Sequence, residues 1–380
     1  MKAVGIIAFV FSLLLFAVPV SAQTANAVSG IVFDQESKKP LSDVHVFLAN
    51  TTKGDVSRKN GEFAIAATQP GVYKLVVMRI GYKRHIQSVE VSDKTIHLEI
   101  KLSPQIYEME ELAIEGKVEG KRREGLSKKW NLNLSEFKKR FLGETPNRRG
   151  CKIVNPDVIR IDMISGFLTA SALEPIIVEN KSLGYQLTYV LEDFWASGSE
   201  FAFNGEPFFE ELESSKQREK RRWRDRRVSA FEGSLQHFLR ALADRSLKKS
   251  GFVMYRLHAN IWKYSENDFL FTMEDFGKDP AYASSILIPS EQTHERTLLF
   301  SEFLHVMYKK AYMPPDYYKR MGLRLAKHRE YTRSSVKLLS SQVTFNELGF
   351  PNNPLEISRS GYWGWTSGVC NWLPFDYEYP

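Results

Sequence analysis

Short runs in which apolar and polar residues alternate fill the chain between residues 28 and 102. The alternation is clear at Tyr73, Leu75 and Val77, and a period of two is typical of a strand with one face on a core. Turn residues separate the runs, and Asn60-Gly61 is the strongest hairpin signal because both residues tolerate a positive φ. About seven such runs predict a small antiparallel β-sandwich over residues 27–103.

A helical pattern begins at residue 130. Trp130, Leu134, Phe137 and Phe141 recur at spacings of three and four, which predicts an amphipathic helix that ends near Gly143. The preceding residues, 104–129, read as a short strand followed by a basic, exposed linker.

Strand-like and helical patterns then mix. Alternating runs predict strands at residues 158–161, 175–178 and 185–191, and a hairpin-like element around Gly205. Residues 216–249 form the longest helical pattern. We therefore expect a multidomain chain in which an all-β sandwich is followed by an α+β domain of unassigned fold over residues 130–380.

The first 22 residues have the composition of an export signal. Lys2 precedes an apolar stretch over residues 4–20, and small residues at Val20-Ser21-Ala22 make Gln23 the expected first mature residue. A retained N-terminal anchor is the alternative, but the stretch is short for a membrane span. We expect no transmembrane helix after cleavage and a location in the periplasm or cell envelope.

Positive charge is concentrated in one segment. Lys and Arg outnumber Asp and Glu by 52 to 45. The first half of the 216–249 helix could contact an anionic surface through Arg218, Lys220, Arg221, Arg222, Arg224, Arg226 and Arg227. The competing interpretation is a solvated helix face, partly balanced by Glu219 and Asp225. We expect no nucleic-acid partner, because no recognised binding module is present.

The chain has two cysteines, Cys151 and Cys370. In an oxidising compartment they could form a disulfide that closes a long loop. Two separate buried thiols are the alternative, because sequence cannot bring the sulfur atoms within reach of each other.

The first segment resembles the carboxypeptidase-regulatory-like family, which has a transthyretin-like β-sandwich fold. The features that carry the resemblance are Gly30, Pro40-Leu41, Asn60-Gly61-Glu62-Phe63, Gly71 with Tyr73, and Ile80-Gly81-Tyr82. The resemblance implies a module without chemistry of its own, found in many envelope proteins of Bacteroidota. Residues 156–161, 174–185 and 233–242 are similar to uncharacterised Bacteroidota proteins with the same first domain, and this similarity implies no activity.

Candidate catalytic motifs are weak. None of the eight His residues has a Glu three positions later, so no zinc carboxypeptidase motif is present and we expect no metal or cofactor. Ser234 and His237 form a Ser/His pair without an identifiable orienting acid. Glu174 with Glu179, or Glu192 with Asp193, could form a glycosidase pair, but sequence does not show their separation. Asp275-Phe276-Gly277 matches the Asp-Phe-Gly motif of protein kinases, but the other kinase motifs are not present in the sequence.

Aromatic residues gather near the end of the sequence, at Tyr362, Trp363, Trp365, Trp372, Phe375, Tyr377 and Tyr379. They could form a sugar-stacking or partner surface, although aromatic residues more often pack in cores and at edges. The leading hypothesis is an exported, non-catalytic binding or assembly protein, with the sandwich as an interaction module and an envelope protein or glycan as partner. The alternative is a hydrolase of glycans or peptides with its active site in residues 130–380.

Overall fold

The computed structural model describes residues 28–66, 69–92, 94–105, 120–198, 200–257, 279–280, 282–289, 294–301, 303–323 and 329–380. In the first helix, side chains are described from Trp130 onward. The expected signal segment, the expected strand at 107–116 and the Asp275-Phe276-Gly277 trio lie outside these residues.

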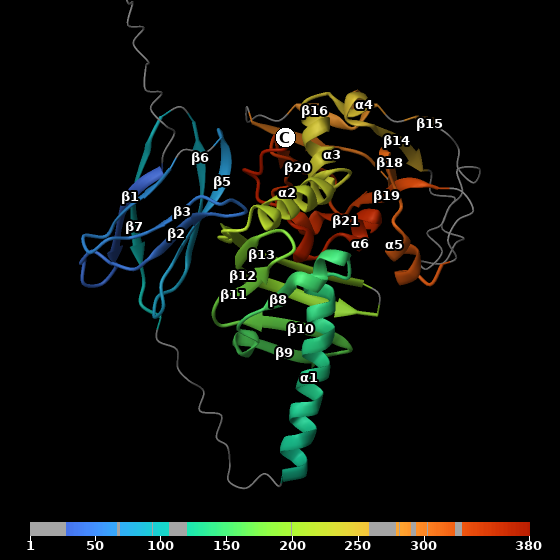
Figure 1. Ribbon diagram of the computed structural model, residues 1–380. Coiled ribbons are helices and arrows are strands. Elements are labelled where there is room, and N and C mark those ends of the chain that lie inside the picture. The colour runs from blue at the N-terminus through green and yellow to red at the C-terminus, as the bar shows by residue number, and fades with distance from the viewer. Residues whose placement is uncertain are drawn as a thin grey trace, which may run out of the picture.

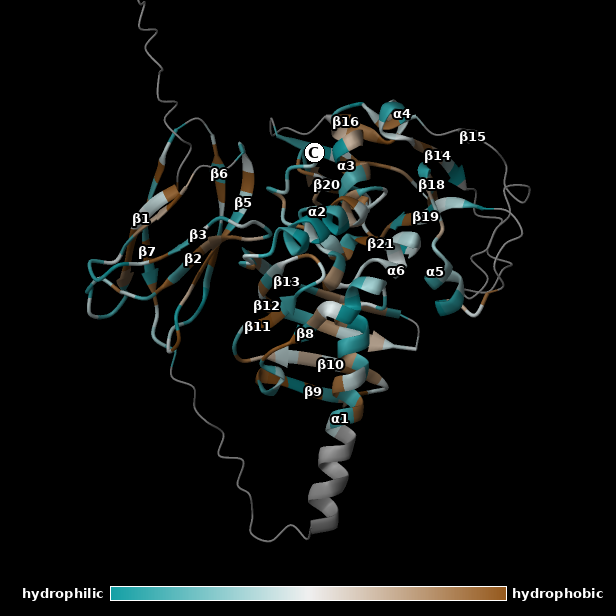
Figure 2. Ribbon diagram, viewed as in Figure 1, coloured by the Kyte–Doolittle hydropathy of each residue, from teal (hydrophilic) through white to brown (hydrophobic). Residues whose placement is uncertain are grey.

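Strands β1 to β7 form a two-sheet sandwich, seen at the left of Figure 1. One sheet has the order β4-β1-β7, with β4 (Glu62–Ile65), β1 (Val28–Asp34) and β7 (Ile96–Leu102). The other has the order β3-β2-β5-β6, with β3 (Gly54–Val56), β2 (His45–Leu48), β5 (Gly71–Met78) and β6 (His85–Val91). Figure 2 shows hydrophobic residues interspersed with hydrophilic ones along these strands.

The sandwich is not wholly antiparallel, contrary to the sequence prediction. β1 pairs with β4 in antiparallel fashion but with β7 in parallel register, from Val28 opposite Ile96 to Asp34 opposite Leu102. Side-chain alternation reports which face of a strand is buried and does not report the direction of its neighbour. β7 crosses from the end of β6 to the other sheet, and it enters that sheet in the direction of β1.

Two further groups of antiparallel sheets make up the second region. The first sheet has the order β8-β11-β12-β10-β9, with β13 also paired to β12. Its strands are β8 (Cys151–Ile153), β9 (Ile159–Ile164), β10 (Phe167–Ala172), β11 (Ile176–Asn180), β12 (Tyr185–Ser197) and β13 (Glu200–Glu211). The predicted strands at 158–161, 175–178 and 185–191 coincide with β9, β11 and β12.

The other group contains a five-stranded and a three-stranded sheet. The five-stranded order is β15 (Asp279–Pro280), β14 (Phe252–Leu257), β18 (Phe303–Tyr312), β19 (Tyr331–Leu338) and β21 (Ile357–Gly361). The three-stranded order is β16 (Leu287–Pro289), β17 (Glu295–Leu298) and β20 (Val343–Asn346). The second region is therefore a mixed α and β structure. Its described residues form two large hydrophobic cores, one under each group of strands, and a smaller cluster around Tyr317.

Helix α1 (Gly120–Leu142) packs Leu134, Phe137 and Phe141 into the first of these cores. It ends where predicted, because Gly143 has a φ of +84°. Its beginning differs from the prediction, since residues 120–129 are helical rather than linker. Trp130 remains 36% exposed and lies apart from the buried stripe.

The predicted long helix over 216–249 is wrong, because three helices occupy it. They are α2 (Gln217–Phe231), α3 (Leu235–Ala243) and α4 (Leu247–Ser250). Gly233 has a φ of +72°, and Ser234 caps α3 by accepting a hydrogen bond from the His237 amide. The segment around Gly205 is also corrected, since it belongs to one continuous strand, β13, that forms a hairpin with β12.

The end of the chain ties these parts together. Cys370 is joined to Cys151 of β8 by a disulfide, and their Cα atoms are 6.1 Å apart. Phe375 then packs into the core of the sandwich. Its amide donates to the carbonyl of Asn50, in the loop after β2.

A second contact joins the sandwich to β12 and β13. Phe47 of β2 stacks near Phe208 of β13, with ring centroids 5.0 Å apart, and Val76 and Val190 complete this apolar cluster. The outer face of the four-stranded sheet is thus covered by the second region of the same chain.

Candidate binding cavity

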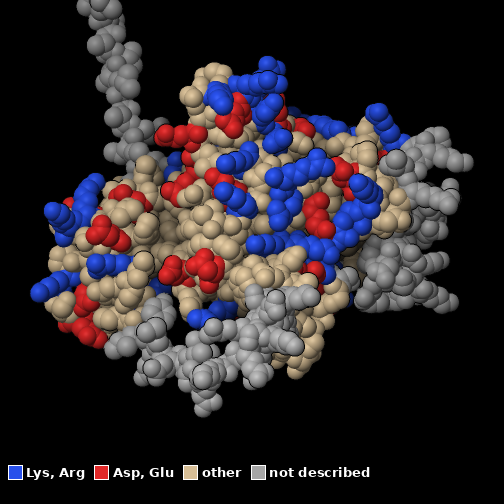
Figure 3. Space-filling view, turned by 60° about the horizontal axis from the view of Figure 1, so that its bottom comes forward, with Lys and Arg blue, Asp and Glu red and all other residues tan. Residues whose placement is uncertain are grey.

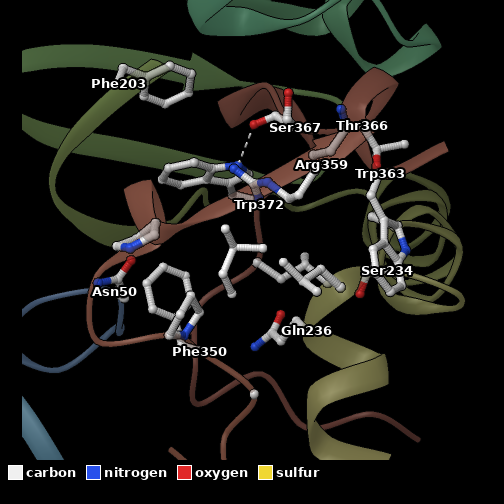
Figure 4. Close-up of a pocket in the computed structure, with 18 of the residues that line it drawn as sticks. Asn50, Phe203, Ser234, Gln236, Phe350, Arg359, Trp363, Thr366, Ser367 and Trp372 are labelled. Atoms are coloured by element: carbon white, nitrogen blue, oxygen red, sulfur yellow. Dashed lines mark hydrogen bonds between the residues drawn. The ribbon is translucent and has the colours of Figure 1, made fainter. Parts of the chain in front are cut away.

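A cavity of about 110 Å³ lies where the sandwich loop, the β12–β13 hairpin, α3, β21 and the C-terminal segment meet (Figure 4). Asn50 is the contribution of the sandwich to its lining. The remaining lining residues come from positions 189 to 373, so no local stretch of sequence builds the cavity.

Much of the wall is apolar and aromatic. Trp372 stacks on Phe203, with ring centroids 5.6 Å apart, and its indole N–H donates to the Ser367 carbonyl at 2.9 Å. The indole N–H of Trp363 donates to the Gly233 carbonyl at 2.6 Å. Both indoles are therefore held in place. Trp363 is 3% exposed and packs against Phe238, whereas Trp372 is only partly buried.

Tyr189 is a buried residue whose hydroxyl has no hydrogen-bond partner among the described residues. Its ring packs edge-on against Phe141, with centroids 5.0 Å apart. Gly205 makes room for this ring, since a Cβ there would lie 2.7 Å from the Tyr189 ring and 2.3 Å from the Val190 carbonyl. Burial raises the pKa of Tyr189 well above its ordinary value, so the hydroxyl stays protonated.

Arg359 brings a positive charge to the cavity. In β21 it lies two residues after Ile357, on the same face of the strand, and both line the cavity. Within the described part of the chain, no side chain or carbonyl bonds its guanidinium. Burial lowers the pKa of Arg359 below its ordinary value, but the group stays charged at neutral pH.

Only one of the two polar side-chain atoms of Asn371 has hydrogen-bond partners among the described residues. Its Oδ1 accepts hydrogen bonds from Thr145 at 2.8 Å and from the Asn147 amide at 3.0 Å. Its buried Nδ2 has no partner among the described residues. Since Oδ1 already accepts from these two donors, Nδ2 is a buried donor in a residue that lines the cavity.

The described lining residues include no Asp, Glu, His or Cys. The hydroxyls of Thr366 and Ser367 donate to carbonyls of the neighbouring turn, and that of Ser234 caps α3. A hydrolase needs a base beside a nucleophile, a pair of carboxylates or a metal. None of these arrangements occurs at this cavity in the part of the chain that the structure describes.

The Ser234–His237 pair serves helix capping. His237 Nδ1 accepts from the Gly233 amide at 3.1 Å, and the Ser234 hydroxyl contacts the His237 backbone rather than its ring. Burial lowers the pKa of His237 to about 4, with the nearby Lys310 and Arg240 adding to the decrease and Glu232 opposing it.

The predicted carboxylate pairs lie apart from the cavity lining. Glu179 forms ion pairs with Lys152 at 3.1 Å and Lys181 at 3.5 Å. Burial alone would raise its pKa, but the two lysines outweigh burial and lower it, which is unsuited to a general acid. Glu192 accepts from the Asn204 amide at 2.9 Å, while Glu174 and Asp193 are exposed. No cluster of three metal-binding side chains occurs among the residues that could be searched.

The seven candidate cations of α2 do not act alike. Six of them are exposed to solvent: Arg218, Lys220, Arg221, Arg222, Arg224 and Arg226. Arg227 is committed internally, because it bonds Glu211 at 2.6 Å and the Leu183 carbonyl at 2.7 Å and lies over the Tyr185 ring. Figure 3 shows Lys and Arg spread widely over the face in view, mainly on the side away from the sandwich.

Some of the C-terminal aromatic residues line the cavity, and the others pack against other parts of the protein. Trp363 and Trp372 line the cavity, whereas Trp365 packs against Tyr317 and Phe375 enters the sandwich core. Tyr377 and Tyr379 pack on Phe231. Sequence reasoning did not single out Tyr189, Arg359 or Asn371, because nothing in the sequence shows that a polar atom lacks a partner.

Residues 28–114 match a family model described as the CarboxypepD_reg-like domain. This confirms the module expected from the sequence, over a little less than a quarter of the chain. No curated protein matches the chain.

Several solved structures are similar to parts of it. A cohesin–X-dockerin complex from Acetivibrio cellulolyticus is 22% identical over 21% of this chain and 58% of that one, with a TM-score of 0.19. A 5-hydroxyisourate hydrolase from Klebsiella pneumoniae is 19% identical over 21% of this chain and 92% of its own, with a TM-score of 0.19. A putative carbohydrate-binding protein from Bacteroides uniformis is 8% identical over 42% of this chain and 56% of its own, also at 0.19. Likeness at this level carries no argument about function.

Within the described residues, no helix is long and apolar enough to cross a membrane.

Proposed function

We propose that this chain is an exported, non-catalytic binding protein of the cell envelope whose ligand site is the cavity between the sandwich loop and the second region. The observation that carries the proposal is the chemistry of the cavity wall. Aromatic side chains and the Arg359 guanidinium line the space, and the described lining residues include no carboxylate, imidazole or thiol. Apolar and aromatic walls with a few polar groups are typical of small-molecule sites.

The sandwich has an internal role in this proposal. Its outer sheet face packs on β12 and β13, and Asn50 supplies part of the cavity lining. In this proposal the sandwich interacts with the second region of its own chain and completes the cavity there. The interaction module expected from the sequence thus acts within the chain. Export is proposed from the signal-like residues 1–22 alone.

A binding screen tests the site. A set of small aromatic, acidic and sugar-like molecules would be titrated against the protein by thermal shift and equilibrium dialysis. Gln236→Trp adds bulk at the cavity wall, and Gln217→Trp adds the same bulk at the exposed start of α2 as the control.

We expect at least one compound to bind the wild type and the Gln217→Trp variant, to be recovered unchanged, and to be lost by Gln236→Trp. Failure of the whole set to bind would contradict the proposal. Turnover of a glycoside, ester or peptide that Gln236→Trp abolishes would also contradict it, in favour of the hydrolase alternative.

Cell fractionation and N-terminal sequencing test the location. A mature protein that begins at Gln23 and appears in the envelope fraction is the expected result. A full-length protein in the cytoplasm would contradict it.

A further inference from the structure

The polar atoms at the cavity wall that lack partners are mainly hydrogen-bond donors. Arg359 lines the cavity, and its guanidinium offers several N–H groups. Asn371 Nδ2, which is a donor only, and the protonated Tyr189 hydroxyl, which can donate one hydrogen bond, are buried within residues of the same wall. A buried donor without an acceptor is costly, so a group of them favours a ligand that is rich in acceptor oxygens.

The charge at the wall has one sign. Arg359 is the only charged side chain among the described residues that line the cavity. Arg359 is half-buried, and an anion that pairs with its guanidinium compensates the hydration that the positive charge loses. The planar guanidinium presents parallel N–H groups that match the two oxygens of a carboxylate.

The size and the walls of the cavity limit the rest of the ligand. A closed cavity of about 150 Å³ in another protein admits benzene. This one is about 110 Å³ and opens to solvent, so a single ring fits only with part of the ligand at the mouth. The indole of Trp372, which is only partly buried, offers a flat apolar surface, and the edge of the buried Trp363 lies beside it at the wall. A compact apolar body of at most about one ring, with one anionic group, fits these limits better than a doubly charged phosphate or a polyhydroxylated sugar.

We propose that the cavity binds small carboxylic acids, with the carboxylate against Arg359 and the apolar body against the tryptophan side of the wall. This inference rests on the proposed binding function and names the ligand class for the same site.

Benzoate and benzamide form a matched pair of probes, because they share the ring and differ in charge. Isothermal titration would compare both with the wild-type protein. We expect benzoate to bind at least about 10-fold more tightly than benzamide, since a hydrogen-bonded charge pair gives this order of discrimination.

Arg359→Gln should weaken benzoate binding at least about 10-fold and leave benzamide binding nearly unchanged. Lys337→Gln is the control, because it removes one positive charge from the neighbouring strand, where Lys337 pairs with Ser358 on the opposite face of the sheet. It should leave both affinities unchanged. If Arg359→Gln does not fold, the affinities of the wild-type protein for benzoate and benzamide still test whether the cavity prefers a carboxylate.

Equal affinities for benzoate and benzamide, or full retention of benzoate binding by a folded Arg359→Gln variant, would overturn the carboxylate proposal. Binding of a neutral sugar in the cavity in place of either probe would also overturn it and would leave the binding function standing. Absence of binding by every compound of the wider screen would reject the proposed function itself.

Discussion

Lys74 of the sandwich and Glu206 of β13 form an ion pair in which Nζ and Oε1 are 2.5 Å apart. The glutamate is 2% exposed, whereas the lysine side chain is 41% exposed. The pair lies beside the apolar contact of Phe47 with Phe208, so it is part of the surface that joins the sandwich to the second region.

Replacing Lys74 by Met should destabilise the protein, because it leaves a buried carboxylate without its partner. The expected loss is about 1–3 kcal/mol, less than for a fully buried pair, since water reaches the lysine and screens the interaction. Chemical denaturation followed by tryptophan fluorescence measures it. An unchanged unfolding curve would show that the ion pair does not hold the interface.

Replacing Glu206 by Gln should behave differently, because burial raises the pKa of Glu206 although Lys74 lowers it. The folded state then holds the proton more firmly than the unfolded state, so stability falls as the pH rises above the ordinary value of 4.5. Glu206→Gln removes this dependence. The unfolding free energy of Glu206→Gln relative to that of the wild type should therefore rise as the pH increases from 4.5 to neutrality, and a relative fall would contradict the assignment.

Arg227 and Arg222 make a matched pair on α2. Arg227→Gln removes the contacts to Glu211, to two carbonyls and to the Tyr185 ring, and should cost about 1–3 kcal/mol. Arg222→Gln changes an exposed residue and should stay within about 0.5 kcal/mol of the wild type. Thermal unfolding of the two variants measures the difference in stability. Equal losses of stability would show that the internal contacts of Arg227 do not stabilise the fold.

The bond between Cys151 and Cys370 predicts a cross-linked peptide in a non-reducing digest of the protein. Cys151→Ser together with Cys370→Ser should lower stability by about 2–5 kcal/mol, because the closed loop spans much of the chain. Two free thiols in the denatured, unreduced protein would contradict this prediction.

Local chemistry explains which parts of the fold could be predicted. Gly61 has a φ of +77°, as the Asn60-Gly61 signal requires, and Phe137 and Phe141 lie on the buried stripe of α1 that their spacing predicted. The break at Gly233-Ser234 had a local signal too, a glycine before a capping serine, but continuous apolar spacing on both sides concealed it.

The site could not be predicted in the same way. Arg359 looks like any polar residue of a short strand, and its significance comes from the lack of an acceptor beside it in space. The sequence singled out Trp363 and Trp372 as part of an aromatic segment, but it could not separate them from Trp365 and Phe375, which pack elsewhere. Asn50 joins the cavity only because the chain end returns to the sandwich.

A crystal structure of the protein soaked with benzoate tests the central claim most directly. We predict electron density for one benzoate in the cavity, with its carboxylate oxygens within hydrogen-bond distance of Arg359 and its ring against the tryptophan wall. A cavity that holds only ordered water at saturating benzoate, with the hydroxyl of Tyr189 and the amide of Asn371 bonded to that water, would contradict the account.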